Sequence, residues 1–192
     1  MRRTVPAALA LALAIVLVAA PVRAADPFPL ERLADGGYAL MLRHALAPGT
    51  GDPAAFELRD CSTQRTLNDV GRAQARALGE ALRAAGIAEA SVYSSQWCRC
   101  LETAELLGLG PVQELPALNS FFGRNRDDRP KRLEALRRFL AEQPTDGPPI
   151  ILVTHQVTVT AITGDFVRSG EGRALALDGT GAPPVAGTTA AP

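Results

Sequence analysis

Two runs of apolar residues end in side chains that are costly to bury. The run 39–42 is followed by Arg43 and His44, and the run 150–153 is followed, after one threonine, by His155. The chain contains two histidines, and both lie at these endings. A strand that served only to build a core would end at a turn residue, so the endings indicate a functional site.

A third segment brings another arginine near the same place. The stretch 90–95 (ASVYSS) is typical of a strand, and Arg99 follows it near the start of the next helix. In open sheets of mainly parallel strands, ligands bind beyond the carboxyl ends of the strands. We therefore expect Arg43, His44, Arg99 and His155 to line one pocket.

These residue types fit a phosphate group. A guanidinium bonds two oxygens at once and stays charged, and the amides that open the helix after His155 (Gln156 and Val157) would add partial positive charge. Nearby cations lower the pKa of an imidazole, and a neutral ring is a nucleophile. One histidine could attack phosphorus while the other holds the oxygens. Taken singly, each histidine is more simply read as a polar surface residue and Arg99 as a helix-surface residue.

The hydrophobic periodicity predicts an α/β fold. Asn68 is a good N-cap for the first long helix, and Gly86 is a good end for it. The alternation of elements predicts a three-layer α/β/α sandwich with a mainly parallel central sheet and helices on both faces. We expect strands at 38–43, 90–95, within 111–118, 149–155 and 173–177, helices at 68–86, 96–110, 130–143 and 156–164, and irregular loops at 45–66 and 119–130.

The domain organisation follows from the two ends of the chain. Residues 1–24 have two early arginines, an apolar run and a small-residue ending, which is typical of a secretory signal peptide cut after Ala24. The alternative is an uncleaved membrane anchor, for which the apolar run is short. We expect one domain at 25–178 and a disordered tail at 179–192. The cleaved chain keeps 17 basic and 20 acidic residues, a net charge of −3, which gives no basic face for nucleic acid.

Three cysteines would meet an oxidising compartment after export. Cys98 and Cys100 are too close in sequence to pair easily with each other, so a disulfide would join Cys61 to one of them. A zinc site built from the cysteines and a histidine is the alternative. It lacks the paired C-x-x-C spacing, so no metal is expected.

Four motifs occur in an order that resembles the histidine phosphatase superfamily and its phosphoglycerate-mutase-like fold. They are LMLRHA, LNDVGRAQARALGEAL, VYSSQWCRCLETAELL and IILVTHQ, and the resemblance covers roughly residues 38–178. It implies that His44 is the phosphorylated nucleophile and that Arg43, Arg99 and His155 bind the phosphoryl group. It also implies that no metal or organic cofactor is needed.

The sequence departs from the family pattern at the position of the proton donor. Ser120 stands near the place of the glutamate that one branch uses, and Gln156 stands where another branch has an aspartate. Ala45 also replaces the glycine of the first motif. The donor is therefore unknown, and each candidate acid is more simply a solvated surface charge. These candidates are Asp60, Glu114, Asp127 and Asp128.

Two further stretches, CSTQR and SSQWCRC, look like a bacterial periplasmic subgroup whose relatives include lipopolysaccharide core heptose-phosphate phosphatases. The resemblance implies a periplasmic or secreted phosphomonoesterase for a small phosphorylated substrate such as a lipopolysaccharide-core sugar phosphate, without a stable membrane span after signal cleavage. Because Cys98 and Cys100 flank Arg99, a disulfide from Cys61 would fix the helix of that arginine to the preceding loop. The alternatives are a non-catalytic phosphate or phospho-sugar binding protein of the same fold and a metal or redox protein built on the cysteines.

Overall fold

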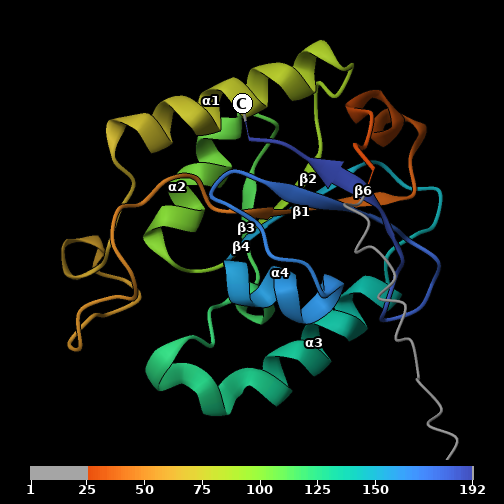
Figure 1. Ribbon diagram of the computed structural model, residues 1–192. Coiled ribbons are helices and arrows are strands. Elements are labelled where there is room, and N and C mark those ends of the chain that lie inside the picture. The colour runs from red at the N-terminus through yellow and green to blue at the C-terminus, as the bar shows by residue number, and fades with distance from the viewer. Residues whose placement is uncertain (1–25, 192) are drawn as a thin grey trace, which may run out of the picture.

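A six-stranded sheet forms the centre of the molecule (Figure 1). The computed structural model describes residues 26–191, apart from the side chain of Arg124. The strand order is β3-β2-β4-β1-β5-β6, with parallel pairing from β3 to β1 and antiparallel pairing from β1 through β5 to β6. The strands are β1 (Tyr38–Arg43), β2 (Ser91–Ser94), β3 (Val112–Glu114), β4 (Ile150–Thr154), β5 (Gly172–Ala176) and β6 (Val185–Thr189).

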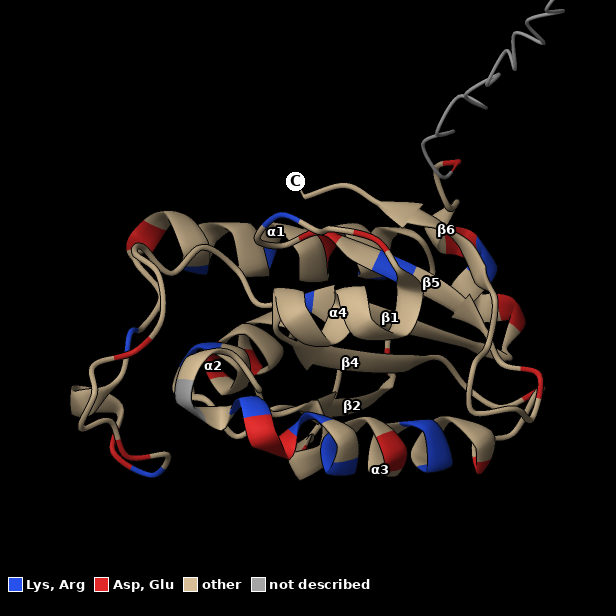
Figure 2. Cartoon of the chain, turned by 60° about the horizontal axis from the view of Figure 1, so that its bottom comes forward, with Lys and Arg blue, Asp and Glu red and all other residues tan. Residues whose placement is uncertain are grey.

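Helices cover both faces of this sheet, so the predicted three-layer architecture is confirmed. Figure 2 shows α1 and α3 on opposite sides of the strands. The α-helices are α1 (Asp69–Ala84), α2 (Cys98–Leu107), α3 (Arg129–Ala141) and α4 (Gln156–Thr163). The short 3₁₀-helices are η1 (Leu30–Asp35), η2 (Cys61–Thr63), η3 (Pro116–Leu118) and η4 (Gly123–Asp128).

The two cores follow from the two-residue period of a strand. In β1, Leu40 and Leu42 pack with α1 and α2, whereas Ala39 and Met41 pack with α3 and α4. All five residues of β4 are buried because its neighbours are the strands β1 and β2 and both of its faces are covered by helices. This burial explains the continuous apolar run that marked β4 in the sequence.

The pairing of β1 with β4 brings the two histidines to the same edge of the sheet. Arg43 is the register partner of Thr154, so the next residue on each strand emerges at the same level. The amide of His44 donates to the carbonyl of Thr154 over 2.9 Å. The backbone alone therefore fixes His44 and His155 as neighbours.

The first turn of α1 holds the loop that follows His44. Asn68 caps the helix as predicted, because its side chain accepts a hydrogen bond from the Gly71 amide at 2.8 Å. A Cβ at Gly71 would lie 2.1 Å from the Leu46 carbonyl oxygen, so only glycine permits this approach. The Gln74 side chain completes the contact by accepting from the Leu46 amide at 3.1 Å.

Two expectations about irregular segments are corrected. The expected disordered tail at 179–192 is wrong for residues 185–189, which form β6 and pair with β5. Thr188 also bridges to Pro27, so β6 is held on both sides. The expected irregular loop at 119–130 contains η4 and the start of α3.

The predicted signal peptide at 1–24, its cleavage site and the alternative membrane anchor lie outside the described residues. Within residues 26–191, no helix combines the length and the apolar character that crossing a membrane requires.

Candidate active site

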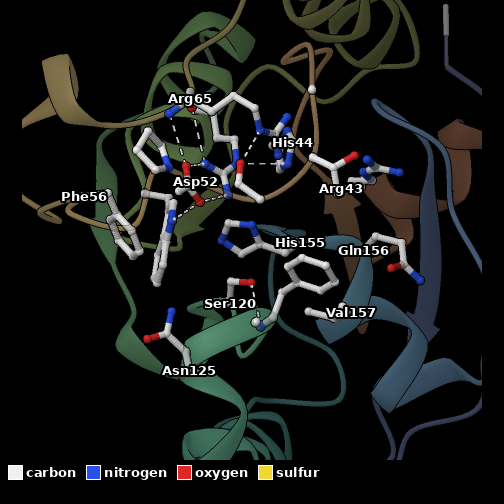
Figure 3. Close-up of a pocket in the computed structure, with 18 of the residues that line it drawn as sticks. Arg43, His44, Asp52, Phe56, Arg65, Ser120, Asn125, His155, Gln156 and Val157 are labelled. Atoms are coloured by element: carbon white, nitrogen blue, oxygen red, sulfur yellow. Dashed lines mark hydrogen bonds and ion pairs between the residues drawn. The ribbon is translucent and has the colours of Figure 1, made fainter.

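The four residues expected to form a site line one cavity of about 380 Å³. His44 and His155 are buried, and their ring centroids are 5.5 Å apart with an interplanar angle of 71°. Arg43 comes from the end of β1 and Arg99 from the first turn of α2. In Figure 3, both histidine rings lie between Arg65 on one side and Ser120 and Asn125 on the other.

The hydrogen bonds of His44 fix its tautomer. Nδ1 lies 2.8 Å from the carbonyl oxygen of Ala45, which can only accept, so Nδ1 carries the proton. Nε2 receives a hydrogen bond from Nε of Arg99 at 3.2 Å, and a guanidinium can only donate. The lone pair of the ring is therefore on Nε2, at the side that faces Arg99.

The surroundings of His44 keep the ring neutral. Burial and then the charge of Arg99 lower the pKa of His44 to about 3, against the smaller opposing effect of its hydrogen bond to the Ala45 carbonyl. A ring with this pKa keeps its lone pair throughout the neutral and mildly acidic range. The sequence-based expectation that neighbouring cations favour an uncharged imidazole agrees with this direction.

His155 is oriented by a chain of buried polar groups. Its Nε2 lies 2.9 Å from the Ser95 hydroxyl, which donates to Oδ1 of Asn119 at 3.1 Å. The Gln96 amide also donates to that oxygen at 2.8 Å, which fixes the orientation of the Asn119 side chain. These contacts hold the ring of His155 in place beside the cavity that it lines. Burial, followed by Arg99 and His44, lowers the pKa of His155 well below its ordinary value.

Among the described residues, three arginines, Arg43, Arg65 and Arg99, line the cavity. Arg43 donates to the Val167 carbonyl at 3.0 Å, while its buried Nε has no partner in the described part of the chain. Arg65, which was not singled out in the sequence as a site residue, donates to the Gly51 carbonyl at 2.9 Å and to the Ala47 carbonyl. Burial and then the charge of Arg99 lower the pKa of both Arg43 and Arg65. This mutual repulsion is relieved when an anion binds among the three guanidinium groups.

Asp52 is the acid that sequence reasoning missed. Its two carboxylate oxygens accept from Nη1 and Nη2 of Arg99 at 2.7 and 3.1 Å. The Arg65 amide and the Trp97 indole also donate to this carboxylate, each at 3.1 Å. Asp52 is the one Asp or Glu among the described residues that line the cavity.

The acids proposed from the sequence as proton donors lie elsewhere. Glu114 accepts a hydrogen bond from Gln96, and Asp60 accepts from Ser62. Asp127 and Asp128 are exposed on η4. None of these four acids is among the described residues that line the cavity.

The other departures from the family pattern have clear places in the structure. Ala45 is buried, and its amide donates to the Thr103 hydroxyl at 3.1 Å, so the extra methyl group is accommodated. Ser120 lines the cavity and accepts from the Phe122 amide at 3.2 Å. Gln156 also lines the cavity, and its side chain donates to Thr160 at 2.8 Å.

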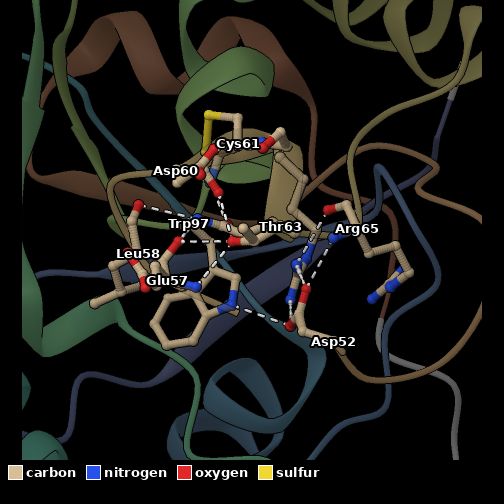
Figure 4. Close-up of a disulfide and its surroundings, with 12 residues drawn as sticks. Asp52, Glu57, Leu58, Asp60, Cys61, Thr63, Arg65 and Trp97 are labelled. Atoms are coloured by element: carbon tan, nitrogen blue, oxygen red, sulfur yellow. Dashed lines mark hydrogen bonds and ion pairs between the residues drawn. A yellow bond between two sulfur atoms is a disulfide. The ribbon is translucent and has the colours of Figure 1, made fainter. Parts of the chain in front are cut away.

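A disulfide joins Cys61 to Cys98, which is one of the two pairings left open by the sequence. It ties η2 to the first residue of α2, next to Arg99 (Figure 4). The Gln64 side chain strengthens this link by accepting from the Cys98 amide at 3.0 Å. Cys100 is a free, buried thiol, and burial raises its pKa to about 12. A zinc site that uses all three thiolates is incompatible with this pairing.

Comparison with known proteins agrees with this architecture. A family model described as histidine phosphatase superfamily (branch 1) matches residues 40–126. No curated protein matches the sequence.

Solved structures with low sequence identity share the fold. The protein histidine phosphatase SixA in complex with tungstate is 16% identical, with a TM-score of 0.60 over 80% of this chain and 96% of that chain. The putative phosphohistidine phosphatase SixA from Nakamurella multipartitia is 19% identical, with a TM-score of 0.57 over 80% and 95%. A phosphoglycerate mutase from Thermus thermophilus is 21% identical, with a TM-score of 0.55 over 81% and 99%. The matched family model covers the segment that contains His44 and Arg99, and these solved structures share the fold of this chain.

Proposed function

We propose that this protein is an exported phosphomonoesterase that works through a phosphohistidine intermediate on His44. The observation that carries the proposal is the lone pair of a neutral, buried His44 Nε2 beside Arg99. Arg43 and Arg65 line the same cavity and supply the remaining positive charge. A buried nucleophile among cations is the arrangement that transfer of a phosphoryl dianion requires.

The proposed reaction has two displacement steps at phosphorus. In the first, Nε2 of His44 forms a bond to phosphorus and the ester P–O bond breaks, so the alcohol leaves with the bonding electrons and takes up a proton. Arg43, Arg99 and His155 hold the phosphoryl oxygens, joined by Arg65. In the second step water attacks phosphorus and gives up a proton to the solvent, which balances the proton that the alcohol took from the solvent in the first step. The P–N bond breaks, its electron pair returns to Nε2, and inorganic phosphate is released.

The proposed substrate is an ester whose leaving group needs little protonation, because the described residues of the cavity offer no free carboxylic acid. The one described carboxylate of the cavity, Asp52, is engaged by Arg99, Arg65 and Trp97. Without general-acid help, which typically contributes about 10²- to 10⁴-fold, esters of poor leaving groups react slowly. This favours a phosphatase over a mutase, because a mutase must return the phosphoryl group to an alcohol.

Export and substrate size complete the proposal. The Cys61–Cys98 disulfide supports a periplasmic or secreted location, since such bonds persist in oxidising compartments. A cavity of about 380 Å³ suits a small phosphorylated molecule. A lipopolysaccharide-core sugar phosphate is the substrate that we propose on the resemblance described above.

Hydrolysis of an aryl phosphate by the purified protein tests the enzymatic activity. We expect turnover that vanadate inhibits and that chelators leave unchanged, and we expect His44→Ala to abolish it. Near wild-type turnover by that variant would show that His44 is not the nucleophile.

The hydrogen bonds that Asp52 accepts from Arg99, Arg65 and Trp97 favour a second function, because they leave the described part of the cavity without a free carboxylic acid as proton donor. A protein of this fold without a proton donor could bind phosphate or phospho-sugars and not hydrolyse them. Thermal stabilisation by phosphate together with no hydrolysis of any phosphate ester would select this function.

A further inference from the structure

The guanidinium of Arg99 has two edges, and Asp52 occupies one of them. The planar group presents an end formed by Nη1 and Nη2 and a side formed by Nε and Nη2. Both oxygens of Asp52 bond to the end, while the side faces Nε2 of His44. Arg99 also donates to the Arg65 carbonyl at 3.3 Å through Nη1.

Four of the five N–H groups of Arg99 therefore have partners within residues 26–191. The fifth is the second N–H of Nη2, on the same side as Nε. A phosphoryl group on His44 Nε2 would displace the Nε hydrogen bond and meet this side edge. The end of the guanidinium, which anions bind equally well, is closed by Asp52.

This arrangement is buried and well supported. The side chains of Arg99 and Asp52 are 4% and 8% exposed, so water does not compete strongly for either. Asp52 is itself held by the Trp97 indole and the Arg65 amide. The Cys61–Cys98 disulfide ties the loop that carries Asp52 to the helix that carries Arg99.

We propose that Asp52 is a positioning residue that directs the side edge of Arg99 toward the phosphoryl group on His44. Asp52 does so by occupying the end of the guanidinium, which would otherwise be free to rotate or to bind phosphate in an unreactive orientation. The proposal rests on the proposed function, because it assigns Asp52 a part in the same reaction. Burial acts to raise the pKa of Asp52, but Arg99 lowers it below its ordinary value, which agrees with a charged partner and not with a proton donor.

Asp52→Asn tests this role while preserving shape. An asparagine places an N–H group against the N–H groups of Arg99, so the bidentate pair is lost. We expect kcat for an aryl phosphate to fall about 10- to 100-fold, the range that small misplacements of a reacting group produce. Affinity for inorganic phosphate should be kept or increased, because the cavity gains one net positive charge. The emission of Trp97, the single tryptophan of the chain, gives a binding readout that does not need turnover.

Asp165→Asn is the matched control. Asp165 pairs with Nε of Arg173 at 2.9 Å and does not line the cavity. We expect this variant to lose stability and to keep kcat.

Formate rescue keeps the test decisive for variants with altered stability. Added formate should restore part of kcat in Asp52→Ala and have no effect on the wild type, because it can fill the end of the guanidinium. If Asp52→Asn does not fold, a folded Asp52→Glu replaces it, and we expect reduced kcat with retained phosphate binding, since the longer side chain shifts Arg99.

Unchanged kcat in the folded variant used, or parallel loss of kcat and phosphate binding, would overturn the positioning role. Absence of turnover in the wild type would instead be a failure of the proposed function.

Discussion

Arg99 donates a hydrogen bond through Nε to Nε2 of His44 over 3.2 Å. Because a guanidinium cannot accept, this contact places the lone pair of the ring on Nε2, while the Ala45 carbonyl keeps the proton on Nδ1. The same cation lowers the proton affinity of the ring, second only to burial. In the proposed reaction, Arg99 therefore selects the nucleophilic atom of His44, keeps that atom unprotonated and binds the phosphoryl group that it attacks.

The neutral histidines make the stability of the protein depend on pH. The folded-state pKa of His44 is about 3, against an ordinary value of 6.5, so between these values the unfolded chain binds the proton and the folded protein does not. Stability therefore falls as the pH decreases through this window, by up to about 1.4 kcal/mol per pH unit for each such histidine. His155 contributes in the same direction.

Urea unfolding from pH 7 to pH 4 measures this effect when the wild type is compared with His44→Gln. The glutamine variant should show a shallower loss of stability, because one group no longer takes up a proton on unfolding. Parallel curves for the two proteins would show that His44 is already protonated in the folded state.

The disulfide should stabilise the protein and support activity. It closes a loop between residues separated by 37 positions, for which chain-entropy arguments give about 3–4 kcal/mol. We expect Cys61→Ser to lower the melting temperature and to reduce kcat, because the loop that carries Asp52 loses its tie to α2. Cys100→Ser, which changes a free thiol, is the control.

Thiol titration checks the pairing directly. The denatured, unreduced protein should show one reactive thiol, that of Cys100. Three titratable thiols without reductant would contradict the disulfide.

Phe122 is expected to contact the leaving group of the substrate. It lines the cavity, and 52% of its surface is exposed, which is unusual for a large apolar side chain. Phe122→Ala should lower the kcat/KM ratio of 2-naphthyl phosphate to phenyl phosphate by about fivefold, the effect of losing about 1 kcal/mol of apolar contact. The two esters have similar leaving groups and differ in apolar surface, so the ratio isolates this contact.

Phe166→Ala provides the comparison for Phe122. Phe166 is similarly exposed, at 64%, and does not line the cavity. Its variant should leave the ratio of the two esters unchanged. An equal change in both variants would mean that the cavity does not select the leaving group through Phe122.

The sheet and the two histidines could be predicted because they depend on short-range pattern. The apolar runs of β1 and β4 have one plausible use in an α/β fold, and parallel strands end at a common edge. Arg43, His44 and His155 lie within two residues of the ends of these runs, so their proximity could be predicted without knowledge of the loops. Arg99 could be predicted for the same reason, because it lies in the first turn of the helix that follows β2.

Asp52 could not be predicted because its place depends on long-range contacts. It lies in a segment rich in Gly, Pro and Ala without periodicity, and its partners Arg99 and Trp97 are 47 and 45 residues away. β6 was missed for a related reason. Its sequence VAGTT has the composition of a loop, and the open edge of β5 decides that it pairs as a strand.

Trapping the phosphorylated enzyme tests the central claim most directly. A short reaction with a labelled aryl phosphate, stopped in base, should yield an acid-labile, base-stable phosphoryl group. Peptide mapping should place the group on Nε2 of His44, and His44→Ala should yield no adduct. An adduct on another residue or on Nδ1, or steady turnover without any adduct, would contradict the mechanism proposed for this protein.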